Sequence, residues 1–409
     1  MTLKVAKREW PRIPVSAIVE KLVYGGDGLA RVNGQVLLAP FVLPGETIET
    51  IAEPGKGNAL RASDLRIINQ AAQRITPQCE YFGVCGGCHY QHADYAFQLA
   101  QKLEILRETL RRLGGIAFEG DVPTRSSAPW HYRNRIQLHC RDRRIGFLHR
   151  KSHELCAIDH CPISSPALNE AIKKMHVAIR DPRWPEFLQS FELFTDEDSI
   201  QLQVSESLRP LAARFFDWID EVLACISRAP IVYAVAGNSY RVSRGSFFQV
   251  NRFLLDDLVH EVVGQIGGRR AIDLYAGVGL FSLPLARRFD YVEAVERGVA
   301  AHADLAFNTS ESAGTISTHK VSTEEFLRGT DYDVDLVVAD PPRAGLRKEA
   351  TAELVRIRAH RLIIVSCDPS TLARDLAALL TAYRIERLTM IDLFPQTFHF
   401  ETVAHLIAT

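Results

Sequence analysis

From residue 269 onward the sequence repeats one pattern, in which a short apolar run, a turn and a helix-like segment follow one another. The apolar runs are residues 271–275, 291–296, 334–340 and 361–366. Runs of this length, separated by helical segments, predict parallel strands joined by crossover helices. Open α/β sheets bind their ligands at the carboxyl ends of the strands. We therefore expect the functional residues to follow these runs.

The run 361–366 ends in Ser366-Cys367-Asp368-Pro369, which places a thiol at the expected sheet edge. Such a cysteine is either a nucleophile or a small apolar core residue, and the local sequence allows both. Two further runs, 388–394 and 400–408, predict a hairpin that carries Glu401 to the same edge. Glu401 is the first candidate for a base near the thiol. His399 competes with it, and Asp368 is a weaker candidate.

A glycine-rich turn, Ala276-Gly277-Val278-Gly279, follows the run 271–275, and Glu296 ends the next run about 20 residues later. This arrangement is typical of a nucleoside-binding unit, in which the glycines admit the ligand and the carboxylate binds ribose hydroxyls. Phe281-Ser282 stands where a dinucleotide fingerprint has its third glycine. That substitution disfavours a bound pyrophosphate and favours S-adenosylmethionine (SAM), which has no phosphate.

The sequence Asp340-Pro-Pro-Arg343 narrows the expected chemistry. SAM-dependent amino methyltransferases carry an aromatic residue after Asn/Asp-Pro-Pro, and Arg343 replaces it here. An amino group needs no covalent activation, whereas C5 of uracil becomes nucleophilic only after a thiolate adds to C6. The sequence therefore predicts that Cys367 makes this addition and that a nearby base later removes the C5 proton.

Residues 12–68 contain short strand-like runs between turn signals, which predict a five-stranded OB-like barrel. This part resembles a TRAM domain through its Gly25-Gly26-Asp27-Gly28 loop and the turn at 41–46. The first 160 residues carry 22 Lys and Arg against 16 Asp and Glu, and the remainder carries 26 against 33. This asymmetry suggests that binding and chemistry are separated. Interleaved basic and aromatic residues at 130–144 favour phosphate contacts with base stacking, or simply a solvated basic strand.

The chain has eight cysteines, and Cys79, Cys85 and Cys88 lie within ten residues. The charged start of the chain predicts no signal peptide, no run is long enough to span a membrane, and we expect a cytoplasmic protein. Clustered cysteines in that compartment favour a metal site. Cys161 or Cys156 would supply a fourth thiolate. Four thiolates suit zinc or a [4Fe–4S] cluster, and the three-plus-one spacing favours the cluster.

The sequence also predicts two helices close to these motifs. Leucines at helical spacing predict a helix over 91–113, which Gly114-Gly115 ends. A second helix is expected over 253–266, directly after Gly245-Ser-Phe-Phe-Gln-Val-Asn251.

In this order, the cysteine motif, the segment 245–251, Asp340-Pro-Pro-Arg343, Ser366-Cys367-Asp-Pro and the Glu401 hairpin resemble the RNA (uracil-5-)-methyltransferases. The resemblance covers nearly the whole chain and is to the iron–sulfur branch that modifies large-subunit ribosomal RNA. It implies a multidomain α/β protein with a TRAM-like OB-fold barrel (8–68) and a central α/β domain with the iron–sulfur loop (69–90 and 126–244). It also implies a helix that packs on the catalytic domain (91–125) and a Rossmann-like SAM methyltransferase domain (245–409).

The resemblance also implies roles for individual residues. The nucleophile is Cys367 and the proton acceptor Glu401. The residues implied to bind SAM are Gln249, Tyr275, Gly277, Glu296 and Asp340, those that bind the substrate are Arg133, Phe247 and Arg343, and those that hold a [4Fe–4S] cluster are Cys79, Cys85, Cys88 and Cys161. Leu280 and Ser322 depart from the family pattern at positions that commonly contact SAM.

The implied partner is large-subunit ribosomal RNA, bound by a monomer with no membrane contact. Two alternatives stay open: the same chemistry on a transfer RNA uridine, and a non-catalytic RNA-binding assembly factor.

Overall fold

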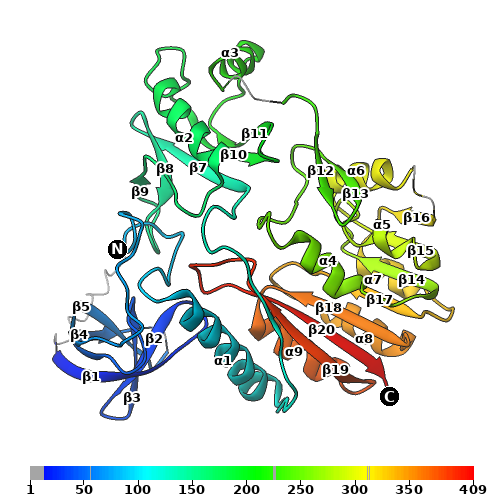
Figure 1. Ribbon diagram of the computed structural model, residues 1–409, viewed down its shortest axis with the longest axis horizontal. Coiled ribbons are helices and arrows are strands. Elements are labelled where there is room, and N and C mark those ends of the chain that lie inside the picture. The colour runs from blue at the N-terminus through cyan, green and yellow to red at the C-terminus, as the bar shows by residue number, and fades with distance from the viewer. Residues whose placement is uncertain (1–12, 56, 224–226, 311, 313) are drawn as a thin grey trace, which may run out of the picture. The chain divides into compact units, whose positions relative to one another are not determined.

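The computed structural model describes residues 13–55, 57–223, 227–310, 312 and 314–409 (Figure 1). Cys225 lies outside the described residues. The chain divides into two compact units. The first unit holds residues 1–83, 87–105 and 396–398, and the second holds residues 84–86, 106–395 and 399–409. No helix in the described part of the chain is long and apolar enough to cross a membrane.

The first unit contains a closed barrel of five strands, in the order β1-β2-β3-β5-β4, as the turn-rich sequence predicts. The strands are β1 (Ile13–Leu22), β2 (Asp27–Val32), β3 (Gln35–Pro40), β4 (Thr47–Pro54) and β5 (Leu60–Asn69). Val19, Ala30, Leu37 and Ile48 are at most 1% exposed and form its core. The buried side chains of these strands fill the interior of the barrel. Residues 8–12 of the predicted domain lie outside the described residues.

A loop from the far end of the chain belongs to this first unit. The backbone carbonyl of Gln396 accepts hydrogen bonds from the amides of His89 and Tyr90, at 2.8 and 3.0 Å. The Gln396 side-chain oxygen accepts another from Gln98 Nε2, at 3.0 Å. Gln98 is only 1% exposed, so these bonds are shielded from water and hold the loop firmly.

The predicted helix over 91–113 is present as α1 (Tyr95–Gly114). It starts later than the predicted boundary at residue 91 because the Asp94 carboxylate accepts the amide of Phe97, at 2.8 Å, and so caps the first turn. Leu106 and Leu110 are buried, whereas Leu113 is 62% exposed at the fraying end. Gly115, with φ of 66°, terminates the helix.

The second unit contains a small antiparallel sheet in the order β11-β10-β7-β8-β9. Its strands are β7 (Arg135–Arg141), β8 (Arg144–Leu148), β9 (Leu155–Ala157), β10 (Leu188–Thr195) and β11 (Ile200–Ser207). Two helices, α2 (Pro166–Ala178) and α3 (Ala213–Leu223), accompany it, and a hairpin of β12 (Ile231–Val235) and β13 (Asn238–Val242) follows.

The main sheet of the second unit has eight strands in the order β16-β15-β14-β17-β18-β20-β19-β6. These are β6 (Thr124–Arg125), β14 (Gly268–Leu274), β15 (Phe289–Val295), β16 (Thr315–His319), β17 (Leu336–Ala339), β18 (Arg361–Ser366), β19 (Tyr383–Ile391) and β20 (Glu401–Ala408). The five strands from β16 to β18 are parallel, and β20 is antiparallel to β18. The predicted strands and final hairpin are confirmed, and the sheet has the doubly wound arrangement expected of them.

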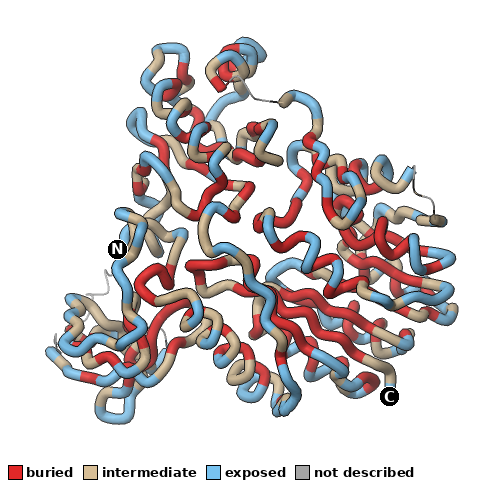
Figure 2. The backbone as a smooth tube through the Cα atoms, viewed as in Figure 1, coloured by how far each residue is buried: buried red, intermediate tan, exposed pale blue. Residues whose placement is uncertain are grey.

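The helices of this sheet are α4 (Leu255–Val263), α5 (Ser282–Leu285), α6 (Val299–Thr309), α7 (Thr323–Arg328), α8 (Lys348–Ile357) and α9 (Pro369–Leu379). The central strands are buried along most of their length (Figure 2). Their apolar side chains pack with α4, α5 and the β12–β13 hairpin in one core. The helix α5 is a single turn.

Candidate active site

Four parallel strands of the second unit end at one edge of the sheet, and each is followed by a predicted site residue. Tyr275 follows β14, Glu296 follows β15, Asp340 follows β17 and Cys367 follows β18. The pairing registers align Leu274 with both Val295 and Ala339, which brings the ends of these strands side by side. The sheet thus gathers these four residues in the region where α/β proteins bind ligands.

The glycine-rich turn after β14 is shaped by its backbone. Gly277 and Gly279 have φ of 57° and 95°, and Tyr275 adopts a left-handed conformation with φ of 60°. The Glu296 carboxylate accepts the amides of Gly277 and Gly298, at 3.0 and 2.5 Å. Glu296 is therefore held in place beside the turn. An oriented carboxylate next to an open glycine turn is suited to bind ribose hydroxyls.

Asp273 lies beneath this turn and was missed by the sequence reasoning. Its side chain is 0% exposed, accepts the Ser282 hydroxyl at 2.5 Å, and has a second oxygen without a hydrogen-bond partner among the described residues. Burial, followed by repulsion from Asp340 and Glu296, raises the pKa of Asp273 to about 7. The available signal was a single carboxylate inside the apolar run 271–274.

Asp304 on α6 anchors the segment 243–246. The sequence did not predict this role of Asp304. The buried Asp304 carboxylate accepts the amide and hydroxyl of Ser243, at 2.7 and 2.6 Å, and the hydroxyl of Ser246, at 2.6 Å. Arg241 Nε lies 3.1 Å from Asp304 Oδ1, which also accepts the Ser243 hydroxyl. This anchoring fixes the chain just before the predicted residues Phe247 and Gln249.

Beyond that anchor the segment presents its side chains in two directions. Phe248 is 2% exposed in the core, so its neighbour Phe247 faces outward and is 62% exposed. Gln249 returns to the sheet edge, where its Nε2 donates to Asp340 Oδ2 at 3.4 Å. The structure thus joins Gln249 to Asp340.

The thiol of Cys367 is half-buried at the end of β18. Burial, followed by the Glu401 carboxylate, raises its pKa to about 12, and Arg343 opposes this shift. The thiol is therefore protonated in the free protein at neutral pH. Asp368 next to it accepts the amides of Ser370 and Thr371 and caps α9, which accounts for that carboxylate structurally.

Glu401 is the first residue of β20 and is 3% exposed. The registered pair Ser366 and Thr402 continues by one step to place Cys367 opposite Glu401. Burial, followed by the charge of Asp340, raises the pKa of Glu401 well above its usual range, and Arg343 opposes this shift. The competing base candidate, His399, lies with its ring 5.9 Å from that of Phe394.

Arg343 is solvent-exposed, and its loop is held by α9. The Asp375 carboxylate accepts the amide of Leu346 at 2.8 Å, and the Arg374 guanidinium donates to the carbonyls of Ala344 and Leu346. The same helix begins at the Asp368 cap beside Cys367. One rigid element therefore sets the positions of both the thiol and the cation that opposes the rise in its pKa.

The sequence predicts that the strand at 130–144 contacts RNA or is a solvated basic strand, and Arg135 fits neither description because its side chain is only 11% exposed. Its guanidinium contacts Glu192 at 2.8 Å, donates to the Ser246 carbonyl at 3.0 Å and lies over the Phe194 ring. Arg135 therefore stabilises the fold. Arg133 is half-buried, and its backbone bridges to that of Asn251, beside the 245–251 segment.

The two departures from the family pattern have structural roles here. Leu280 is 7% exposed, and its carbonyl accepts the Tyr240 hydroxyl at 3.0 Å. Ser322 caps α7 by accepting the amide of Glu325 at 3.2 Å.

The predicted cluster cysteines Cys79, Cys85, Cys88 and Cys161 are thiols that form no disulfide. Within the described ranges, no group of three or more His, Cys, Asp or Glu side chains is placed to hold a metal ion. The Cys85 thiol instead shares a hydrogen bond with Cys156, the residue weighed against Cys161 as a fourth ligand. Cys79 and Cys88 belong to the first unit and Cys85 and Cys161 to the second, and the [4Fe–4S] cluster stays a prediction.

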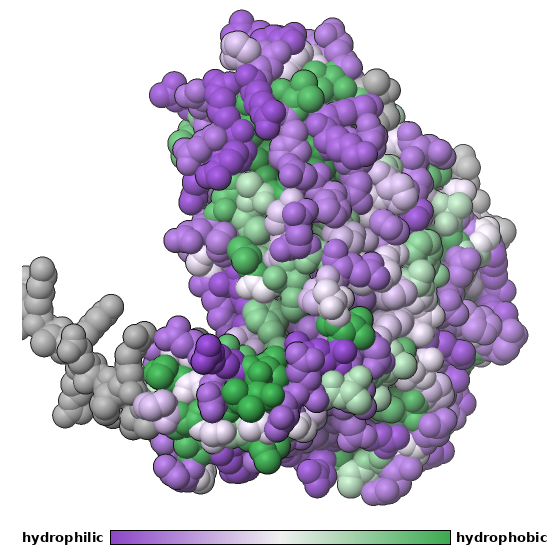
Figure 3. All heavy atoms as spheres, turned by 60° about the vertical axis from the view of Figure 1, so that its left-hand side comes forward, coloured by the Kyte–Doolittle hydropathy of each residue, from purple (hydrophilic) through white to green (hydrophobic). Residues whose placement is uncertain are grey.

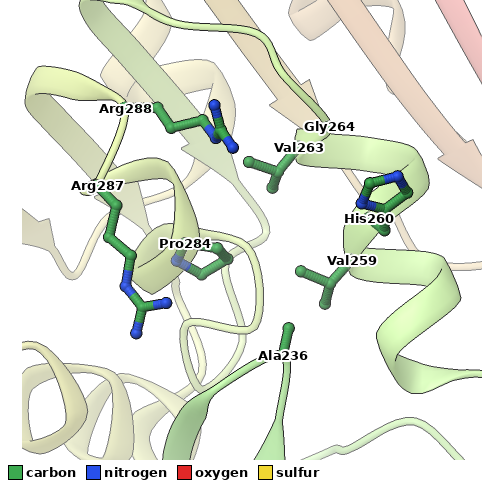
Figure 4. A pocket seen from close by; sticks show the side chains of 8 residues that line it. All are labelled: Ala236, Val259, His260, Val263, Gly264, Pro284, Arg287 and Arg288. Atoms are coloured by element: carbon green, nitrogen blue, oxygen red, sulfur yellow. The ribbon is translucent and has the colours of Figure 1, made fainter.

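A cavity of about 400 Å³ opens elsewhere in the second unit. Figure 4 shows Val259, Val263 and His260 of α4 on one side and Arg287 and Arg288 on the other. None of the predicted site residues lines it. The Arg287 guanidinium donates to the side-chain oxygen of Asn238, which ties this cavity to the β12–β13 hairpin.

Comparison with known proteins agrees with this geometry. The family model described as tRNA (Uracil-5-)-methyltransferase matches residues 216–409. An uncharacterized RNA methyltransferase of Aquifex aeolicus is 31% identical and covers 96% of this chain and 98% of its own length. The 23S rRNA (uracil(1939)-C(5))-methyltransferase RlmD of Salmonella typhimurium is 30% identical and covers 97% of both chains.

One solved structure is similar along nearly the whole chain. The Pyrococcus abyssi tRNA (uracil-54, C5)-methyltransferase, in complex with S-adenosyl-L-homocysteine, superposes with a TM-score of 0.77 at 26% identity, covering 96% of this chain and 100% of that one. The full-length relatives are of the same class of enzyme that the doubly wound sheet and the residues at its carboxyl edge indicate. The chain belongs to the family of SAM-dependent RNA (uracil-5-)-methyltransferases.

Proposed function

We propose that this enzyme methylates C5 of a uridine in RNA through a covalent bond between Cys367 and C6 of the uracil. The observation that supports this proposal is the register of β18 and β20, which would set Cys367 opposite the buried Glu401 if it continued one residue beyond the last pair, Ser366 and Thr402. A nucleophile and a proton acceptor on facing strands match the two roles that the reaction requires.

The reaction follows in four steps. The Cys367 thiol gives its proton to water as its sulfur adds to C6, and the π electron pair of the C5–C6 bond moves into the ring to give an enolate. C5 then attacks the methyl group of SAM, and the sulfonium sulfur takes the electrons of the broken bond and leaves as S-adenosylhomocysteine. Glu401 removes the proton from C5. The C5–C6 double bond re-forms as the C6–S bond breaks and releases the thiolate.

The electrostatics of the site support these roles. A carboxylate of raised pKa is a stronger base than an exposed glutamate, which favours proton removal by Glu401. The high pKa of Cys367 keeps the thiol protonated until the substrate arrives. Arg343 counters both shifts, and we assign it to the substrate pocket with Arg133 and Phe247. A flipped-out uridine must reach this pocket because a paired base hides C6.

For SAM, we propose a pocket formed by Gln249, Tyr275, Gly277, Glu296 and Asp340. The oriented Glu296 carboxylate and the open glycine turn support this assignment. Replacing Glu296 with glutamine should raise the KM for SAM more than the KM for RNA.

The RNA substrate we propose is large-subunit ribosomal RNA, and transfer RNA is the alternative. Full-length relatives named as 23S rRNA methyltransferases favour the first, and a structural neighbour named as a tRNA methyltransferase favours the second. We assign the barrel to a TRAM-like RNA-binding domain and infer a monomeric, cytoplasmic enzyme. Mapping 5-methyluridine in RNA from cells with and without this gene distinguishes the two substrates.

A direct test of the mechanism uses SAM with a labelled methyl group and RNA transcripts of both classes. Wild-type protein should place label on C5 of uridine, and Cys367→Ala should place none. Cys140→Ala is the matched control, since Cys140 is a half-buried thiol on β7, outside the proposed site. Labelled 5-methyluridine formed by Cys367→Ala would refute the covalent mechanism. RNA binding without methyl transfer by the wild type would instead support an assembly factor.

We retain the [4Fe–4S] cluster as a proposal that rests on cysteine spacing and family resemblance alone. Cys79, Cys85, Cys88 and Cys161 would hold it, and the methyl transfer needs no electron from it. Protein purified without oxygen should contain about four iron and four sulfide ions and absorb near 400 nm. One zinc ion in a colourless protein would refute the proposal.

A further inference from the structure

The segment 247–253 exposes an aromatic ring at each end. Phe247 is 62% exposed and Phe253 is 39% exposed. Between them, Phe248, Gln249 and Asn251 are at most 7% exposed. Phe247 is already assigned to the uridine pocket, whereas Phe253 has no role in the proposed chemistry. An exposed aromatic ring beside a substrate site needs an explanation, because burying it would be favourable.

Phe253 is held rigidly in this exposed position. Its amide donates to the Asn251 side-chain oxygen at 3.0 Å, and the Arg252 guanidinium lies 4.6 Å from the ring centroid. Arg252 is itself fixed, because its amide donates to the Tyr132 carbonyl and its Nε to the His131 carbonyl, both at 3.0 Å. The ring and the cation are thus pre-organised before any ligand arrives.

This rigid pair is continuous with the proposed active site. Asn251 bridges to Arg133, which is assigned to the substrate, and its side-chain nitrogen donates to the Leu393 carbonyl at 3.2 Å. Gln249, four residues before Phe253, reaches Asp340. Phe253 thus ends a segment whose residues Asn251 and Gln249 contact two residues of the proposed site, Arg133 and Asp340.

The chemistry of the pair fits an unpaired base. Aromatic rings with a neighbouring guanidinium stack on bases of any sequence. Flipping a uridine into the active site deprives its neighbours of a stacking partner, and an exposed ring can replace that partner. A single ring-and-cation pair is too small an apolar surface for a protein interface. Hydrophobic and hydrophilic residues lie interspersed on the face of the molecule shown in Figure 3.

We propose that Phe253, backed by Arg252, is a stacking subsite for an unpaired nucleotide adjacent to the target uridine. The proposal rests on the function proposed above and adds a second point of RNA recognition. One acidic residue, Glu197, lies 3.4 Å from Arg252 and partly offsets its charge, so the subsite binds through the ring more than through net charge.

The chain offers a matched control pair. Phe307 on α6 is 56% exposed and has the Arg241 guanidinium 4.5 Å from its ring centroid, but it lies outside the segment 247–253. The variants are therefore Phe253→Ala, Phe253→Leu, Phe253→Tyr and Phe307→Ala. Leucine keeps apolar bulk without a flat face, whereas tyrosine keeps the flat face.

Steady-state methylation of the transcript that the wild type modifies is the first measurement. Phe253→Ala and Phe253→Leu should raise the KM for RNA about 10-fold or more, the effect expected of a lost stacked base. The KM for SAM should stay within about 2-fold, and Phe253→Tyr and Phe307→Ala should resemble the wild type in every constant. A Phe253→Leu enzyme with a wild-type KM for RNA would overturn the stacking subsite.

Direct binding of a 12-nucleotide oligouridylate separates this proposal from the proposed function. Fluorescence anisotropy should show weaker binding for Phe253→Ala and Phe253→Leu than for Phe307→Ala. If the wild type transfers no methyl group to any RNA, the proposed function fails, and the binding comparison still tests the subsite. Equal binding by Phe253→Ala and Phe307→Ala would overturn the subsite while leaving the methyl transfer intact.

Discussion

Replacing Asp304 tests whether the segment before Phe247 must be anchored for catalysis. Asp304 touches neither proposed ligand, yet its carboxylate accepts three hydrogen bonds of 2.6–2.7 Å from Ser243 and Ser246. Alanine removes all three bonds and the contact with Arg241. Asparagine keeps the shape and one acceptor oxygen but loses the charge.

The structure sets the size of the expected effect. A hydrogen bond to a charged group contributes about 1.5–3 kcal/mol to stability. The two freed serine hydroxyls can rotate to other acceptors, and Arg241 is partly exposed, so the loss lies below the sum of the three bonds. We expect the free energy of unfolding to fall by about 3–5 kcal/mol for Asp304→Ala, in line with loss of one partner of a buried ion pair. Asp304→Asn should lose about 1–2 kcal/mol, because it keeps some of the bonds.

Urea denaturation and steady-state kinetics at 25 °C measure the two consequences. A misplaced Phe247 and Gln249 should lower kcat/KM for RNA by about 10–100-fold in folded Asp304→Ala, since small misplacements near a reacting centre are costly. Asp257→Ala, which removes an exposed carboxylate of α4, is the control. An Asp304→Ala enzyme that matches this control in urea midpoint and in kcat/KM would refute the anchoring argument.

Three further predictions concern the buried acids and the thiol. Glu401→Gln should form the C6 adduct and transfer the methyl group but fail to release the methylated RNA, because the C5 proton stays in place. A covalent protein–RNA complex should then accumulate on denaturing gels. Free 5-methyluridine formed at the wild-type rate would contradict this role. Because the pKa of Asp273 is raised to about 7, the folded protein binds the extra proton below that pH and loses stability as pH rises. Between pH 6 and 8 the loss due to Asp273 is about 1.4 kcal/mol, and Asp273→Asn should reduce the pH dependence of the free energy of unfolding by about that amount. Asp340, whose pKa burial also raises to about 7, should keep the remaining loss in this range. Urea titrations at the two pH values measure the difference, and an unchanged pH dependence in Asp273→Asn would argue against it. The Cys367 thiol, with a pKa of about 12, should react with iodoacetamide about 100-fold more slowly than free cysteine at pH 8, and the reaction should speed up beyond pH 9. Mass spectrometry of the labelled peptide measures the rate, and fast labelling at pH 8 would contradict the prediction.

The sequence predicted the elements that carry the chemistry because their patterns are local. Apolar runs and turn residues identify β18 and the final hairpin, and the position of Cys367 at a strand end follows from them. That Cys367 lies opposite Glu401 does not follow, because it depends on the register with which β20 pairs with β18. Asp304 could not be recognised either, since on its helix it resembles an ordinary polar residue until the chain folds over it.

Arg135 shows the opposite error. In a basic, aromatic-rich strand it resembles an RNA contact, but its partner Glu192 is 57 residues away in sequence. Alternation along one strand says which side chains share a face and not what covers that face. Long-range partners decide whether a cation is an RNA ligand or part of the core.

The hydrogen bonds of Gln396 have a practical consequence for shortening this protein. Its partners His89, Tyr90 and Gln98 lie about 300 residues before the catalytic hairpin in the sequence. They nevertheless hold the loop between β19 and β20 at Gln396, five residues before Glu401. A fragment starting at residue 106 would keep every proposed SAM ligand and both catalytic groups, but it would lose these bonds. The fragment that carries the methyl-transfer residues is therefore not independent of the residues before it. Removing the amino-terminal 105 residues should impair proton abstraction as well as RNA binding.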